Sequence, residues 1–149
     1  MKKNKLNAWY QDAIVYENDV LKRAQKEFQQ YIEKLEPLGL MLDIDLAWTY
    51  FGDDALSFER IDMKDGYICT LGVQVRRATD SAYDLDLEAI TYNIEINRLR
   101  RTIWFNRYKY EHCPQMILNE NFIDVHQTIK RVLEEGYDKV LDEIRHETH

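Results

Sequence analysis

The spacing of apolar residues changes abruptly at Pro37 and Gly39, and this change most limits the folds open to the chain. Before it, apolar residues recur every three or four positions, which is the spacing of one face of an α-helix. They are Trp9, Ala13, Tyr16, Val20, Ala24, Phe28, Tyr31 and Leu35. After it, apolar and polar residues alternate, as in a half-buried β-strand. Because proline cannot continue a helix and glycine frees the turn, the sequence predicts a helix over 6–35 and a strand over 40–50.

The next two segments predict a β-hairpin. Residues 56–62 and 67–77 both carry alternating apolar residues, and Lys64-Asp65-Gly66 lies between them. Asp-Gly is a strong signal for a tight hairpin turn. If the two arms pair across this turn, their apolar side chains share one face of the sheet: Leu56, Phe58, Leu71, Val73 and Val75.

Residues 83–105 fit two patterns. As a strand, their apolar residues point inward with one change of parity between Ala89 and Ile90, which predicts a bulge, and the polar residues through Asn97 point outward. As a helix they form one apolar stripe, but Leu87 and other apolar residues then lie on the opposite side. The strand is therefore favoured, and a further strand is expected over about 102–110.

A last helix is expected from about Ile123 to Ile144, with Asn121 or Asp124 as its N-cap and Gly136 in its interior marking close packing or a kink. Only five Gly and two Pro interrupt the 149 residues, and no linker or repeat divides them. The sequence therefore predicts a single α+β domain over residues 1–149: a long N-terminal helix, an antiparallel meander of about four to five strands and a C-terminal helix. Both helices are expected to cover one face of the sheet.

Composition narrows the class of protein. Hydrophobic residues make up 45% and charged residues 32% of the chain, which is a globular balance. No apolar stretch approaches the ~20 residues that span a bilayer, and no signal-peptide core follows Met1, so a cytoplasmic protein without membrane contact is expected. Cys69 and Cys113 lack a zinc-site spacing and are expected to be reduced thiols. No nucleophile elbow, phosphate loop or dinucleotide fingerprint occurs, so no catalytic residue, metal or cofactor is predicted.

The long helix allows a second copy of the chain to bind. Ile14, Leu21, Phe28 and Leu35 form a strict heptad. A heptad favours a homodimer through a coiled coil, whereas packing of the helix on the sheet is the simpler interpretation.

Acidic residues form one candidate partner-binding surface. The chain carries 27 Asp and Glu against 20 Lys and Arg, a formal net charge of −7. The outward positions of the predicted strands hold Asp43, Asp45, Asp84, Asp86 and Glu88. Such rows of carboxylates are able to present a potential like that of nucleic-acid phosphates, as in small inhibitors encoded by mobile elements. The simpler interpretation is that these residues provide solubility.

A basic, aromatic segment forms the second candidate surface. Its residues are Arg98, Arg100, Arg101, Trp104, Arg107, Tyr108, Lys109 and Tyr110. Cations with interleaved aromatic rings are typical of single-strand nucleic-acid binding, although the net charge opposes a polyanion. The simpler interpretation is that these cations pair with acidic residues on neighbouring strands.

A third pattern, Asp54, Asp62 and Lys64, resembles in residue type the metal site of magnesium-dependent nucleases. Asp62 and Lys64 flank a turn, which weakens this interpretation. We therefore expect a non-enzymatic protein, regulatory or inhibitory, that binds another macromolecule through its acidic and basic surfaces. Nucleic-acid binding through residues 98–110 is the alternative, and a nuclease is the least supported hypothesis.

Overall fold

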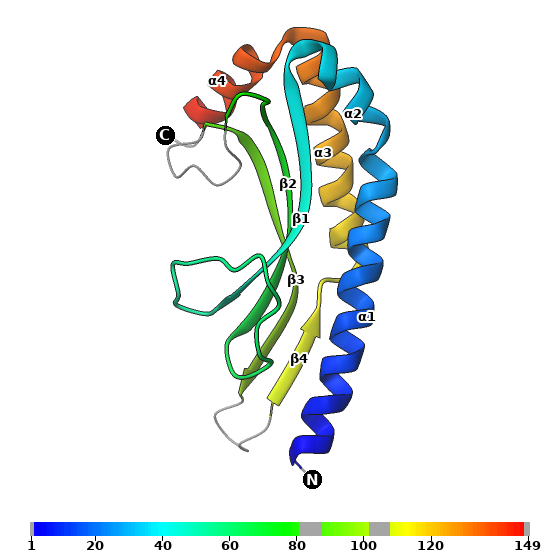
Figure 1. The fold of residues 1–149 in the computed structure, drawn as a ribbon, viewed down its shortest axis with the longest axis vertical. Coiled ribbons are helices and arrows are strands. Elements are labelled where there is room, and N and C mark those ends of the chain that lie inside the picture. Colours follow the sequence, from blue (N-terminus) through cyan, green and yellow to red (C-terminus); the bar gives the residue numbers. More distant parts are fainter. Residues whose placement is uncertain (1, 81–87, 102–107, 148–149) are drawn as a thin grey trace.

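The computed structural model describes residues 2–80, 88–101 and 108–147, with side chains from Trp9 onward. The described elements, in chain order, are α1 (Lys2–Phe28), α2 (Gln30–Leu35), the 3₁₀ turn η1 (Glu36–Leu38), β1 (Leu40–Tyr50), β2 (Tyr67–Arg77), β3 (Ile90–Arg101), β4 (Tyr108–His112), α3 (Gln115–Glu135) and α4 (Tyr137–Glu147). The four strands form one antiparallel sheet in the order β1-β2-β3-β4 (Figure 1). The predicted α+β fold is confirmed.

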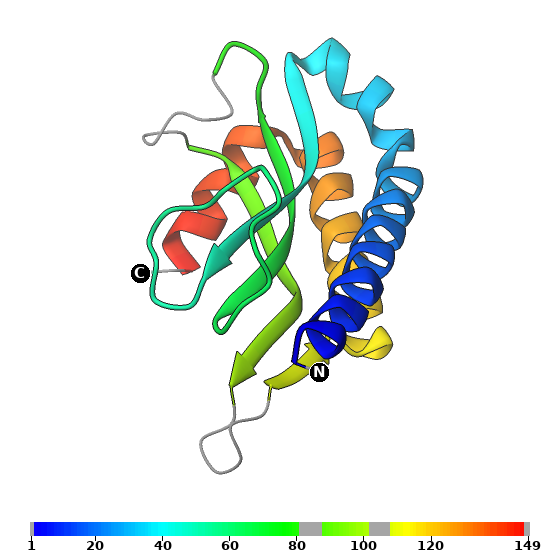
Figure 2. The ribbon, with the colours of Figure 1, turned by 60° about the horizontal axis from the view of Figure 1, so that its bottom comes forward.

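Helices cover one face of the sheet and leave the other open. Figures 1 and 2 show α1 and α3 running along the same face, while the loop of residues 51–66 lies on the opposite side. The core between helices and sheet includes Phe28, Tyr31, Leu71 and Ile129, each at most 1% exposed. None of the helices in the described ranges is long and apolar enough to cross a bilayer.

α1 is the long helix that the sequence predicts, and its apolar stripe packs on the sheet. After Gln29, which keeps helical dihedral angles (φ −54°, ψ −36°), the helix continues as α2. Pro37 lies in η1, and Gly39 takes a φ of 72° that leads into β1. Phe28 and Leu35 of the heptad are fully buried within the chain. Dimerisation through this helix stays a prediction.

The predicted hairpin arm over 56–62 is wrong. β2 pairs instead with β1, from Leu40 opposite Arg77 to Tyr50 opposite Tyr67, and residues 51–66 form the loop between these strands. Ser57 alone pairs with β1, through one bridge to Trp48. The 11-residue strand β1 offers β2 a longer continuous ladder than the short segment 56–62, and this explains the outcome.

β3 confirms the strand interpretation over 90–101, but its bulge lies elsewhere than expected. Asn97 pairs with Cys69 and Glu95 with Thr70, so Ile96 is the extra residue opposite this pair. The bulge turns Asn97 inward, where it is 1% exposed, although the sequence predicts it to point outward. Of the strand expected over 102–110, the structure places β4 at Tyr108–His112, and residues 102–107 lie outside the described residues.

The single C-terminal helix is also wrong, because α3 begins earlier and ends at Gly136. α3 starts at Gln115, with Pro114 as its N-cap (φ −57°, ψ 141°), and not at Asn121 or Asp124. Gly136 has φ 103° and ψ 147°, a conformation that only glycine adopts readily. This break lets α4 fold across one end of the sheet (Figure 1).

The substitution Gly136→Ala distinguishes one continuous C-terminal helix from two helices divided at Gly136, because it should change the free energy of unfolding in opposite directions. In one continuous helix alanine would raise stability by about 1 kcal/mol. At the observed positive φ we expect it to lower the free energy of unfolding by about 1–3 kcal/mol, measured by urea denaturation. The matched control is Glu134→Ala, an exposed position in the last turn of α3, with an expected change within about 0.5 kcal/mol. A stabilised Gly136→Ala variant would contradict the break.

Candidate protein-interaction face

The open face of the sheet carries a groove with a volume of about 240 Å³. One wall is apolar and comes from the loop of residues 51–66, in which Leu56 is 53% and Phe58 52% exposed. The floor comes from the open faces of β1, β2 and β3. The remaining lining residues are Asp43, Asp45, Ala47, Gly72, Gln74, Thr91 and Asn93.

Gly72 keeps the floor of the groove low. It lies between Asp45 of β1 and Asn93 of β3, which are its partners in register. A Cβ at this position would meet the Asp45 carbonyl oxygen at 3.6 Å and the Asn93 Oδ1 at 3.7 Å, which are ordinary contacts. The backbone therefore tolerates a side chain here, and its absence deepens the groove beside Asp45.

The two carboxylates of the groove are in different electrostatic situations. Asp43 accepts a hydrogen bond from Arg76 Nε at 2.6 Å, and Arg76 is only 7% exposed. Arg76 also donates to the Asp80 carbonyl at 2.5 Å, so its guanidinium is held in place. Asp45 has no ion pair among the described residues, and partial burial together with the charge of Asp43 raises the pKa of its carboxyl group. Of the two carboxylates of the groove, Asp45 is thus the one without a countercharge among the residues that the structure describes.

A second cluster lies inside the molecule, around the fully buried Glu17 of α1. Its Oε1 accepts hydrogen bonds from Arg60 Nη1 at 2.5 Å and Trp48 Nε1 at 3.2 Å. Its Oε2 accepts from the Tyr67 hydroxyl at 2.6 Å and Asn97 Nδ2 at 2.7 Å. Burial and the Glu17 carboxylate raise the pKa of the Tyr67 hydroxyl, so this group stays a donor at neutral pH. Four donors thus compensate the desolvation of one carboxylate.

His112 of β4 extends this cluster toward the surface. Its Nδ1 lies 2.8 Å from Asn97 Oδ1, which accepts only, so the proton is on Nδ1. The rings of Tyr16 and Tyr110 contact it with centroids 4.3 and 4.5 Å away. The resulting desolvation lowers the pKa of His112, while Asp12 and Glu17 act weakly in the opposite direction.

The buried cluster fixes the loop that forms the apolar wall of the groove. Arg60 reaches Glu17 from this loop, and its guanidinium also lies 5.0 Å from the Trp48 ring. Trp48 and Ser57 exchange two backbone hydrogen bonds of 2.8 Å. The loop is therefore attached on the helix side through Arg60, while Leu56 and Phe58 lie on the open face. The position of the groove depends on the Glu17 cluster.

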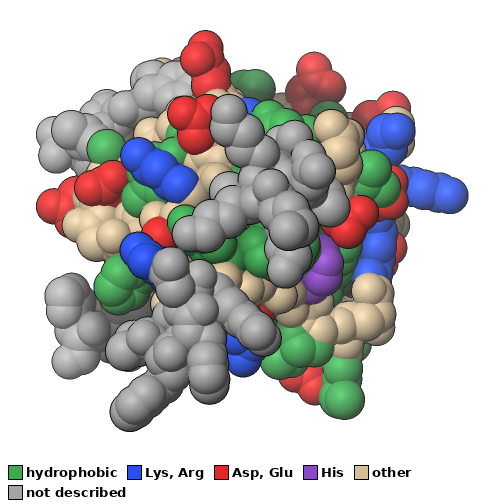
Figure 3. All heavy atoms as spheres, turned by 90° about the horizontal axis from the view of Figure 1, so that it is seen from below, with side chains coloured by type: hydrophobic (Ala, Val, Ile, Leu, Met, Phe, Trp, Pro, Cys, Tyr) green, Lys and Arg blue, Asp and Glu red, His purple; other side chains and the backbone are tan. Residues whose placement is uncertain are grey.

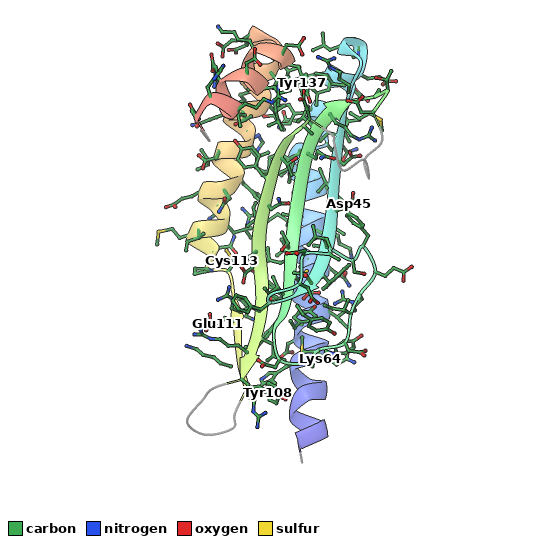
Figure 4. The ribbon with its side chains drawn as sticks, turned by 90° about the vertical axis from the view of Figure 1, so that its left-hand side faces the viewer. Asp45, Lys64, Tyr108, Glu111, Cys113 and Tyr137 are labelled. Carbon is green, nitrogen blue, oxygen red and sulfur yellow. The ribbon has the colours of Figure 1, made fainter. Side chains whose placement is uncertain are left out.

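The structure brings together part of the predicted acidic row. Asp43 and Asp45 both lie on the open face, as predicted, and Figure 4 shows Asp45 at the β1 edge. Glu88 is separate from them and pairs with Arg145 of α4. Asp84 and Asp86 lie outside the described residues.

The described cations of the basic segment other than Arg101 have acidic partners within the chain. Arg98 pairs with Glu95 at 2.6 Å, and Arg100 and Lys109 both pair with Glu111, at 3.2 and 3.3 Å. The Tyr108 ring packs edge-on against Trp9, and the Tyr110 hydroxyl is buried. Figure 3 shows this lower end of the molecule, where acidic and basic side chains are interspersed over the described surface. Arg101 is exposed, and Trp104 and Arg107 lie outside the described residues.

The proposed magnesium ligands do not gather into a site. Asp62 contributes its carbonyl oxygen to a 2.7 Å hydrogen bond from the Tyr50 hydroxyl, and the Lys64 ammonium lies 4.6 Å from the Tyr50 ring centroid. Within residues 2–80, 88–101 and 108–147, no three acidic, histidine or cysteine side chains lie close enough together to hold a metal ion.

Sequence reasoning identified Asp43 and Asp45, but it missed Glu17, Arg60 and Arg76. Glu17 falls in the apolar stripe of α1 between Ala13 and Val20, and a charge at such a position is the one signal that could have revealed it. Nothing in the local pattern indicates that Arg60 pairs with Glu17 or that Arg76 pairs with Asp43. No protein-family model, curated protein or solved structure matches the chain.

Glu17→Ala tests the buried cluster. Removing the acceptor leaves the Arg60 guanidinium without its carboxylate and the buried Tyr67 hydroxyl and Asn97 amide without an acceptor. We therefore expect the free energy of unfolding to fall by about 3–5 kcal/mol, measured by urea denaturation. Asp19→Ala is the matched control, because Asp19 is exposed on the same helix, with an expected change within about 0.5 kcal/mol. Equal effects of the two substitutions would exclude a structural role for the cluster.

The lowered pKa of His112 predicts that the stability of the fold depends on pH. Its folded pKa lies below its unfolded value of about 6.5, so the unfolded chain binds more protons and folding favours neutral His112. The contribution of neutral His112 to the free energy of unfolding is complete above the pKa that this residue has in the unfolded chain. It is lost as the pH falls through the pKa of His112 in the folded chain. Between pH 7 and pH 5 we therefore expect stability to fall less steeply in His112→Gln than in the wild type. His146→Gln, at the end of α4, is the control and should keep the wild-type slope.

Proposed function

We propose that this chain is a non-enzymatic protein-binding domain, regulatory or inhibitory, whose binding site is the groove of the open face. The observation that carries the proposal is the combination of Asp45, which has no countercharge within the described part of the chain, with the exposed apolar side chains of Leu56 and Phe58. An ionised side chain next to an apolar wall complements a partner segment that carries Lys or Arg together with apolar residues.

The energetics of Asp45 support a binding role. Its raised pKa means that the folded chain holds this carboxylate at a cost to stability. A bound ammonium or guanidinium group would supply the missing countercharge. The neighbouring Asp43 already has Arg76, so the charge available to a partner is concentrated at one position. A site that costs stability when empty is typical of residues kept for function.

The acidic surface supports recognition of a basic protein segment better than full mimicry of a nucleic-acid strand. Mimicry needs a row of free carboxylates, and among the described residues Asp43 and Glu88 both have arginine partners. The described cations of the basic segment, apart from Arg101, are ion-paired with Glu95 and Glu111 in the same way, which disfavours this surface as a nucleic-acid site. The groove is therefore the surface on which we place the partner.

A selection from displayed random dodecapeptides tests the proposal. We expect the wild type to enrich peptides in which Lys or Arg is interspersed with apolar residues, and Asp45→Lys to enrich none of them. A synthetic peptide from the selection should bind Asp45→Asn about tenfold more weakly than the wild type, measured by fluorescence anisotropy. Enrichment that Asp45→Lys shares would contradict the proposal. So would binding of a labelled oligonucleotide by a chain that enriches no peptide.

The variant Asp45→Asn also tests how the Asp45 carboxylate affects stability. Because the folded pKa of Asp45 is raised above its unfolded value, the ionised carboxylate is disfavoured by folding at pH 7. Asp45→Asn should therefore be at least as stable as the wild type in thermal denaturation at pH 7, and the difference should disappear as the pH falls below the unfolded pKa of about 3.9. A destabilised Asp45→Asn would show that this carboxylate has a structural role instead.

A further inference from the structure

We propose that the partner binds as an added β-strand, paired with the free edge of β1, and that its basic side chains then lie beside Asp43 and Asp45. This inference rests on the proposed function and adds the binding mode and the form of the ligand: an extended segment with Lys or Arg at alternate positions. Pairing of a foreign strand with a sheet edge is a recurring way in which proteins bind extended peptides.

The backbone of β1 directs alternate residues outward at this edge. The N–H and C=O of Trp48 form hydrogen bonds with Ser57 and not with β2, so these backbone groups point away from the sheet. In an antiparallel strand this direction repeats at every second residue. Leu42, Ile44 and Leu46 therefore also direct their N–H and C=O groups outward. Within the described residues no backbone partner meets these groups, because β1 is the end strand of the sheet.

The chain itself stops pairing with this edge after one bridge. The Ser57 hydroxyl accepts a hydrogen bond from the Glu59 N–H at 3.1 Å and donates to the Glu59 carbonyl at 2.7 Å. This local turn satisfies the backbone of Glu59 and ends the extended conformation. Arg60 then draws the chain toward Glu17 on the helix side. The edge from Leu42 to Leu46 is thereby left to an outside strand.

The side chains that flank this edge specify the charge of the added strand. Asp43 and Asp45 point to the open face, so residues of an added strand on that face lie within about 5.5 Å of them at the Cβ atoms. Opposite charges stabilise such cross-strand pairs, and like charges destabilise them. A basic strand therefore fits.

The same charges disfavour a second copy of this chain as the occupant. Antiparallel pairing of two β1 strands about Ile44 would place Asp43 of one copy opposite Asp45 of the other. Charged side chains on an edge strand are a device by which such strands avoid pairing with themselves. The occupant to which the edge is suited is thus a strand from another protein.

Hydrogen exchange with a defined peptide tests the binding mode. The probe is the acetylated and amidated octapeptide (Lys-Val)₄, with (Glu-Val)₄ and the block isomer Lys₄Val₄ as controls, added to ¹⁵N-labelled protein. We expect (Lys-Val)₄ to slow exchange of the Leu42 and Ile44 amides at least tenfold. The Asp43 and Asp45 amides, which already face β2, should not change and act as internal controls. The two control peptides should have no effect on any of the four amides.

N-methylation of the peptide gives a second readout that leaves the protein unaltered. Methyl groups on alternate backbone nitrogens block one edge of a strand, so methylation in one register should abolish binding in anisotropy and methylation in the other should not. Binding of (Lys-Val)₄ without protection of Leu42 and Ile44, or equal effects of the two registers, would overturn strand addition and leave the groove as the site. Protection without peptide, in a dimer, would assign the edge to a second copy. Failure of the peptide selection, in contrast, would remove the proposed function itself.

Discussion

The buried carboxylate of Glu17 is the interaction on which the arrangement of this protein depends. It joins α1 to β1 through Trp48, to β2 through Tyr67 and to β3 through Asn97, while Arg60 attaches the loop of residues 51–66. A fully buried carboxylate is tolerable only when donors replace its lost hydration, and here four donors do so. Because the donors come from four separate segments, they are all in place only in the folded chain. The cluster therefore selects one packing of helix, sheet and loop.

The candidate site follows from this constraint. The loop of residues 51–66 leaves the ladder after the Ser57 bridge, crosses the β1 edge and is held by Arg60 on the helix side. This path leaves Leu56 and Phe58 over the open face, and it leaves the β1 edge from Leu42 to Leu46 without a paired strand among the described residues. The groove and the free edge are thus two results of one anchoring contact.

Charge is distributed differently on the two halves of the open face. Toward β4, cations and carboxylates are matched, since Glu95 and Glu111 neutralise Arg98, Arg100 and Lys109. Figure 4 shows Glu111 and Asp45 at opposite edges of the sheet. Toward β1, Arg76 neutralises only Asp43. The sequence identifies both charged segments, but it does not show which of them is neutralised internally, because that depends on strand register.

The sequence by itself determined the fold class, the long helix, the strands 40–50 and 67–77 and a strand within 83–105, because side-chain periodicity is a local property that few glycines and prolines interrupt. Tertiary structure decided which strands pair, where the bulge turns Asn97 inward and where Gly136 divides the last helix. It also decided the partners of the buried charges, since Glu17 and Asn97 are 80 residues apart in the sequence. Such contacts depend on register and desolvation, which are set only when distant segments meet. The groove beside Asp45 belongs to this second group, because its wall and its floor come from separate parts of the chain.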